Sequence, residues 1–280
     1  MENQRGREIA MPPVKSPEYM HISIDDVIEI LRELDVNDYK SIWEHPVFSF
    51  LKSLNQEYGA VFSLYCFYMS KDGQWNLDQM SNQFKAEFEE ASNWLRFGFH
   101  SYQYETKYGL TNKKLSVQEA VNHYSLITNA ICQFASSSVI DTVPRIHFYQ
   151  GTREKTRAWR DTKNGIRGLL SADDARDEVY YLNQMQREKL IKSDDYFDSD
   201  EKLYFVHTDF RLENESNPIQ KLQTIMQDIN YSEQRQIHCI FTHEDKLNLE
   251  TIKKKMNDCC NWAFSNGYEF LFPMDTSPNC

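Results

Sequence analysis

Short apolar runs alternate along the chain with longer segments in which apolar residues recur every three or four positions. The short runs are typical of buried strands, and the longer spacing is typical of amphipathic helices. We expect strands at residues 21–24, 61–69, 97–100, 145–149, 166–170, 179–182, 203–207, 237–242 and 268–272. We expect helices at residues 27–34, 47–58, 78–95, 117–134, 153–163, 183–192, 219–229 and 247–265.

Strands that alternate with helices in this way predict βαβ units, a mostly parallel sheet and right-handed crossovers. Seven or eight such units favour a closed or nearly closed (β/α) barrel over an open sheet, within the α/β class. The sequence has no internal repeat and no linker rich in Ser, Gly or Pro, so we expect a single domain over residues 20–280. Residues 1–19 are polar, contain a Pro-Pro pair and are expected to form a flexible arm.

Two local signals place helix ends. Pro46 suits the first turn of a helix, and Asn266-Gly267 is expected to end the last one. The acidic stretch 193–201 is expected to be a solvated loop.

The charge of the chain limits its partners. The 280 residues carry 31 basic and 42 acidic side chains, a formal net charge of −11, which argues against nucleic acid or an anionic membrane as the main partner. Hydrophobic residues make up 40%, enough for a large core. The sequence has neither a signal peptide nor an apolar run of membrane-spanning length, so we expect a soluble, cytoplasmic protein.

The sequence lacks the motifs of several common phosphate-binding, catalytic and zinc-binding sites. Neither Gly-x-Gly-x-x-Gly nor Gly-Lys-Ser/Thr occurs, and neither Gly-x-Ser-x-Gly nor His-Glu-x-x-His is present. The six cysteines show no Cys-x-x-Cys spacing, which argues against a thiolate zinc site.

Polar residues that follow the predicted strands are the candidates for chemistry, because the carboxyl ends of parallel strands meet at one rim. These residues are Asp25, Asp26, His100, His147, His207, Asp209 and His243. Read singly, each strand-end histidine is more often structural, and the aspartate pair could equally cap the following helix. The remaining histidines (His21, His45, His123 and His238) are interpreted as structural.

As a group, these side chains predict metal-assisted hydrolysis. One carboxylate and imidazole nitrogens can hold Zn²⁺ or a similar divalent ion, which lowers the pKa of water toward neutrality. A second carboxylate can accept the proton of that water, and an imidazole can protonate a leaving amine or alcohol.

Three motifs, in this order and spacing, resemble the polysaccharide deacetylase family: ISIDDV at 22–27, GFHSY at 98–102 and FTHE at 241–244. The resemblance implies a distorted (β/α)7 barrel and metal-dependent deacetylation of a carbohydrate. It implies that Asp25 is the general base and His243 the general acid, and that Asp26 and His100 bind the metal, with Zn²⁺ as the expected ion.

The chain departs from the family pattern at the second metal histidine, where Tyr104 stands. The remaining ligand would come from Glu105, His147, His207, Asp209 or water. Arg145 is expected to line the site with these residues. Rim aromatics such as Tyr104 could stack on sugar rings, although core packing is the commoner role of any one of them.

We therefore expect a metal-dependent hydrolase that removes an acyl group, an N-acetyl group in the first instance, from a carbohydrate or sugar conjugate. Because the second histidine of the motif is missing, a non-catalytic carbohydrate-binding or interaction protein with a degenerate metal site is the alternative. A different metal-dependent hydrolysis on the same barrel is also open, since fold does not fix the substrate.

Overall fold

The computed structural model describes residues 18–109, 115–174, 176–227 and 237–275. The predicted arm, except for its last two residues, lies outside the described residues, and Tyr19 already belongs to the first strand. Within the described residues, none of the helices combines the length and apolar character that crossing a bilayer requires.

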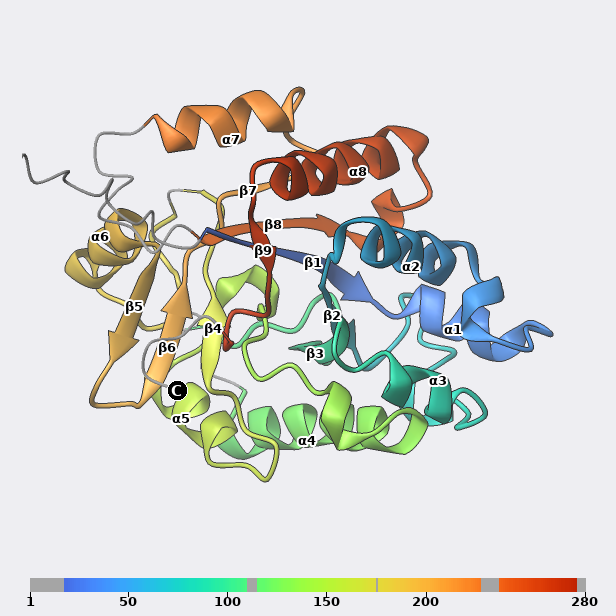
Figure 1. The fold of residues 1–280 in the computed structure, drawn as a ribbon. Coiled ribbons are helices and arrows are strands. Elements are labelled where there is room, and N and C mark those ends of the chain that lie inside the picture. The colour runs from blue at the N-terminus through green and yellow to red at the C-terminus, as the bar shows by residue number, and fades with distance from the viewer. Residues whose placement is uncertain (1–17, 110–114, 175, 228–236, 276–280) are drawn as a thin grey trace, which may run out of the picture.

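A mostly parallel sheet forms the centre of the molecule (Figure 1). Its strands run in the order β3-β2-β1-β8-β7, and β9 pairs with β1 outside this path. Every pairing within it is parallel. The strands are β1 (Tyr19–Val27), β2 (Phe62–Phe67), β3 (Leu95–Ser101), β7 (Phe210–Arg211), β8 (Ile237–His243) and β9 (Glu269–Phe270).

A second sheet has the order β4-β6-β5 and contains one antiparallel pair, β5 with β6. Its strands are β4 (Gly168–Leu170), β5 (Asp195–Asp198) and β6 (Leu203–Val206). The segment 140–144 joins the two sheets, because Asp141 donates its backbone N–H to Phe97 and Thr142 accepts that of Arg167. No ladder between β6 and β7 is seen in the described part of the chain, so the two sheets are separate there.

Helices cover both faces of the central sheet. In Figure 1, α2, α7 and α8 lie on one side and α4 and α5 on the other. The helices are α1 (Glu29–Val36), α2 (Pro46–Tyr58), α3 (Lys85–Glu90), α4 (Val117–Phe134), α5 (Arg153–Arg160), α6 (Gln184–Ser193), α7 (Pro218–Met226) and α8 (Glu250–Ser265). Burial on both faces explains why β2 is mostly apolar rather than alternating, with Ser63 as its one hydroxyl residue outside the aromatic rings.

The α/β class, the mostly parallel strands and the single domain predicted from the sequence are confirmed. Helix α4 has the predicted bounds, and Pro46 begins α2. Helix α8 ends at Ser265, with Asn266 as its C-cap before Gly267, whose φ is +80°. The capping box of Ser116 and Glu119 explains why the start of α4 is so well defined.

Four predicted elements were wrong. Residues 145–149 end in a 3₁₀ turn (His147–Tyr149) rather than a strand, and residues 179–182 form turns. The long helix expected over 78–95 is reduced to a 3₁₀ turn (Leu77–Gln79) and α3. The acidic stretch 193–201 contains β5, because Tyr196 and Phe197 pair with β6 between flanking carboxylates.

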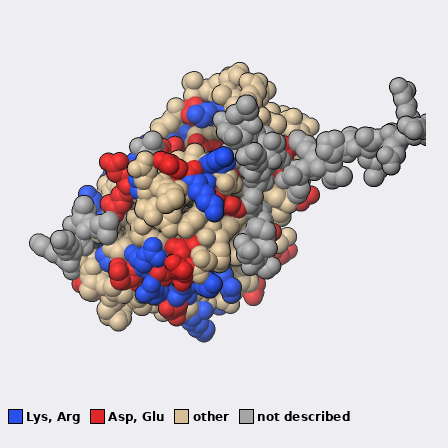
Figure 2. Space-filling model, turned by 90° about the vertical axis from the view of Figure 1, so that its left-hand side faces the viewer, with Lys and Arg blue, Asp and Glu red and all other residues tan. Residues whose placement is uncertain are grey.

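On the molecular face in Figure 2, acidic and basic side chains are interspersed. This face offers no continuous basic surface of the kind that binds nucleic acid.

Candidate functional site

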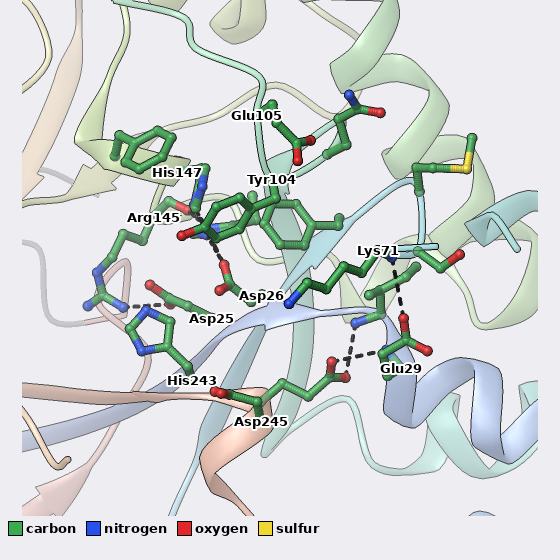
Figure 3. A pocket seen from close by; sticks show the side chains of 18 of the residues that line it. Asp25, Asp26, Glu29, Lys71, Tyr104, Glu105, Arg145, His147, His243 and Asp245 are labelled. Atoms are coloured by element: carbon green, nitrogen blue, oxygen red, sulfur yellow. Dashed lines mark hydrogen bonds and ion pairs between the residues drawn. The ribbon is translucent and has the colours of Figure 1, made fainter. Parts of the chain in front are cut away.

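The end of β1 is shaped to present two carboxylates in different directions. The β1–β2 register shifts between Ile24 and Val27, and Asp26 has a left-handed backbone with φ of +64°. Such a bulge redirects side chains at a strand end, and the conformation is unfavourable for a non-glycine residue. Asp25 lies beside His243 in the β1–β8 register, whereas Asp26 faces β3 and the segment after it (Figure 3).

Asp26, His100 and His147 bring three potential ligand atoms within 4.8 Å of one another. His100 Nε2 lies 3.0 Å from Asp26 Oδ1 and 3.1 Å from His147 Nδ1, and His147 Nδ1 lies 3.6 Å from the same carboxylate oxygen. Although burial opposes it, the hydrogen bond from His100 lowers the pKa of Asp26. The carboxylate is therefore ionised at neutral pH.

The protonation of these imidazoles suits a metal ion. His100 Nδ1 lies 2.6 Å from the carbonyl oxygen of Arg145, which can only accept, so Nδ1 carries a proton and Nε2 is the nitrogen that faces Asp26 and would bind a metal ion. Burial lowers the pKa of His147 to about 3, which keeps its ring neutral. Two imidazoles and one carboxylate fit Zn²⁺ and related divalent ions.

A strained turn carries His147 into the cluster. Phe148 and Tyr149 both have φ of +58°. The His147 ring packs against Phe67 at 5.2 Å and against Tyr104 at 5.1 Å, measured between ring centroids. Tyr104, where the sequence motif would have its second histidine, thus contacts the side chain that completes the cluster.

Asp25 is held by a buried arginine. Arg145 Nη1 lies 2.8 Å from Asp25 Oδ1 and also donates to Ser23 Oγ at 2.8 Å. Its guanidinium stacks on the ring of Phe241 at 4.0 Å, and only 1% of its side chain is exposed. This packing orients the Asp25 carboxylate beside the cluster.

His243 is held by Glu213, which the sequence analysis did not select. His243 Nδ1 hydrogen-bonds the Glu213 carboxylate, and Thr242 Oγ1 donates to the other Glu213 oxygen at 2.9 Å. Burial alone would lower the pKa of His243, but Glu213 and the negative charges of Asp25 and Asp26 raise it. The imidazolium form is therefore favoured.

The predicted alternative role of the aspartate pair, capping the next helix, is wrong. The N-cap residue of α1 is Ile28, and the carboxylate of Glu244 accepts the backbone N–H groups of Ile28, Glu29 and Ile30 at 2.8–3.0 Å. Burial raises the pKa of Glu244 to about 8 against the opposing effect of these donors. Asp25 and Asp26 remain free of any capping role.

These groups surround a cavity of about 940 Å³. Besides the cluster, its lining includes Asp25, Tyr104, Glu105, Arg145 and His243. Tyr104 is 54% exposed at the mouth, and Figure 3 shows Lys71 reaching toward the interior. The volume is within the range of small-molecule sites.

His207 and Asp209 do not line this cavity, which corrects their predicted place in the site. The chain turns after β6, so that the Asp209 carboxylate accepts the backbone N–H of Cys239 at 2.8 Å and faces His238. His207 is half-buried and does not line the cavity, and desolvation lowers its pKa.

Two further residues near the site, Glu213 and Asp173, were not selected from the sequence. Asp173 forms a two-pronged ion pair with Arg211, at 2.9 Å to each oxygen, and Arg211 lines the cavity. Glu213 lies in the polar run after β7, and β7 itself is too short to show an apolar strand pattern.

No family model and no curated protein matches the sequence. Among solved structures, a family 4 acetyl xylan esterase from Clostridium thermocellum, in complex with a cobalt ion, is similar with a TM-score of 0.50 and 10% identity. The similarity covers 92% of this chain and 90% of the esterase. The Xyl-CE4 domain of a multidomain xylanase from the hindgut metagenome of Trinervitermes trinervoides has a TM-score of 0.48 at 10% identity, over 93% of this chain and 89% of that domain.

The catalytic domain of a peptidoglycan N-acetylglucosamine deacetylase from Eubacterium rectale has a TM-score of 0.44 at 13% identity, over 96% of this chain and 93% of that domain. The resemblance to polysaccharide deacetylases predicted from three short motifs is therefore confirmed at the level of the fold, which the chain shares with the family 4 acetyl xylan esterase.

Proposed function

We propose that the protein is a metal-dependent hydrolase that removes an acyl group, in the first instance N-acetyl, from a carbohydrate. The observation that carries this proposal is the convergence of Asp26, His100 and His147 beside Asp25 and His243 in one cavity. The deacetylase-like fold agrees with it, since the similar esterase is named for action on acetyl xylan.

In this proposal, Asp26, His100 and His147 hold the cation, with Zn²⁺ as the expected ion. When bound, the ion would supply a Lewis acid that polarises the acyl carbonyl and lowers the pKa of water. His147 takes the role that the sequence motif would give to a residue at position 104. With His147 as the third ligand, the missing histidine at position 104 no longer argues for the non-catalytic alternative.

Asp25 acts as the general base. It accepts a proton from the attacking water. The ion pair with Arg145 holds the Asp25 carboxylate in place. The water oxygen forms a bond to the acyl carbon, and the bond from that carbon to the sugar nitrogen breaks.

His243 acts as the general acid. It donates its proton from Nε2 to the departing nitrogen, because Nδ1 is engaged by Glu213. Tyr104 and Glu105, at the cavity mouth, are in place to contact the sugar ring. The products are acetate and the free amino sugar.

Acetate release from a panel of N-acetylated and O-acetylated sugars tests the proposal. We expect release that is abolished by a chelator and restored by a divalent metal. The substitution D25N should remove turnover while the protein still binds the metal. Metal-independent release, or no release from any panel member by metal-loaded protein, would contradict the proposed function.

A further inference from the structure

A second cavity, of about 430 Å³, lies at the opposite end of the strands. Its lining includes Arg167, which directly precedes β4, and Lys202, which directly precedes β6. The proposed catalytic residues Asp25 and His243 instead lie at the carboxyl ends of β1 and β8, so the two cavities open at opposite ends of the fold. Nothing in the proposed hydrolysis uses this second cavity.

The charge of the lining is unusual for this chain. Four of its residues are basic and none is acidic, although the whole chain has a net charge of −11. The basic residues are Arg160, Lys163, Arg167 and Lys202. Gathering like charges around a concave surface is unfavourable unless an opposite charge is bound there.

Three of these four cations have no ion-pair partner within the described residues. Arg160 already forms an ion pair, since its Nε lies 2.8 Å from the Asp161 carboxylate. For Lys163, Arg167 and Lys202, no carboxylate among the described residues lies within ion-pair distance. Their charges are therefore available to a ligand.

The backbone fixes where these cations stand. Arg167 donates its N–H to the carbonyl of Thr142 at 2.7 Å and accepts that of Tyr204 at 3.0 Å. A Cβ on Gly165 would lie 1.9 Å from the carbonyl oxygen of Arg160, so the loop before β4 is packed tightly onto the end of α5. Lys202 has φ of +53°, a conformation in which glycine or asparagine is far more common than lysine.

We propose that this cavity is a binding site for a phosphorylated small molecule. The planar guanidinium of Arg167 and the two ammonium groups match phosphate oxygens, and the hydroxyl groups of Ser137 and Thr142 add further hydrogen-bonding groups. Ile140 and Ile166 supply an apolar wall for the uncharged part of the ligand. The volume fits a sugar phosphate or a molecule of similar size.

Nucleic acid fits the site less well. Binding of a polyanion along its backbone needs an extended basic surface, whereas the molecular face in Figure 2 mixes both signs of charge.

Calorimetric titration of the full chain with glucose 1-phosphate, with unphosphorylated glucose beside it, tests the proposal. We expect saturable binding of the phosphate ester that weakens with salt, and no binding of glucose. The double variant R167Q/K202N removes two of the cations, and asparagine tolerates the backbone at position 202. It should weaken binding about tenfold or more, because two charge-assisted hydrogen bonds to the phosphate are lost.

The matched control is K40Q/K254Q, which removes the same charge from two exposed sites elsewhere and should leave binding within about twofold. Circular dichroism and the unfolding midpoint check that both variants fold, and K163Q is the substitute if R167Q/K202N does not. Absence of saturation at millimolar glucose 1-phosphate, equal binding of glucose, or equal weakening by both double variants would each overturn the site.

Discussion

The two cavities, at opposite ends of the strands, suit ligands of opposite charge. At the carboxyl ends of the strands, a carboxylate and two imidazoles converge on a point that a cation would complete. At the amino ends, basic side chains line a hollow, and three of them have no ion-pair partner in the described part of the chain. The first arrangement suits a cation and the second suits an anion.

The difference also lies in how the groups are held. At the carboxyl end, Asp25 and His243 each have a dedicated partner, Arg145 and Glu213, that fixes the side chain. At the amino end the side chains of Arg167 and Lys202 are exposed, and only their backbone is fixed. Catalytic side chains must be held in one geometry for a bond to break, whereas mobile basic side chains are sufficient to bind an anion.

The largest effect is expected from D25N. The substitution keeps the shape of the side chain but removes its capacity to accept a proton, so the rate of acetate release should fall about 10²- to 10⁴-fold. Metal content, measured by elemental analysis, should be unchanged. Turnover that survives in this variant would remove Asp25 as the base.

His147→Gln should have the next largest effect, on metal affinity. Loss of one of three ligands is expected to weaken binding of Zn²⁺ about 10- to 100-fold or more in competition with a chelator. Tyr104→Phe is the matched control, because it keeps the ring that packs against His147 and should retain affinity within about twofold. Equal affinity in wild type and H147Q would show that the third ligand comes from elsewhere.

Glu213→Gln tests how the proton of His243 is held. Glu213 raises the pKa of His243, so its removal should lower that pKa. The general acid must be protonated, and activity falls as pH rises through its pKa. The alkaline limb of the pH–rate profile should therefore move to lower pH, while the metal content stays the same. If the alkaline limb does not move, a group other than His243 is responsible for that limb.

The smallest effect is expected when a variant of one cavity is assayed for the function of the other cavity. R167Q/K202N should release acetate within about twofold of wild type, because the removed charges are exposed and lie at the far end of the strands. Conversely, D25N should bind glucose 1-phosphate like wild type. A large loss in either assay would mean that the two cavities are coupled rather than independent.

Much of the site was predictable because parallel strands meet at one rim. Asp25, Asp26, His100 and His243 each follow an apolar run, and each lines the cavity. The same rule failed for Asp209, because the turn after β6 directs its carboxylate to the backbone of Cys239. Strand ends can be read from sequence, but the path of the following loop cannot.

His147 and Glu213 show the limits of that rule. His147 was among the candidates as the end of a strand, yet it reaches the cluster from a 3₁₀ turn with two left-handed residues. Glu213 follows a strand of only two residues, too short to give a hydrophobic pattern. The cations of the amino-end cavity left no sequence signal, because Lys202 is far in sequence from the three that lie at the end of α5 and in the segment after it.

The most direct test of the account is the metal content of the purified protein after loading with Zn²⁺ and removal of excess ion. We predict about one divalent ion per chain in wild type, and its loss in D26N with the fold retained. Retention of the ion in D26N, or a folded wild-type protein that takes up none, would contradict the central claim that Asp26, His100 and His147 form a metal site.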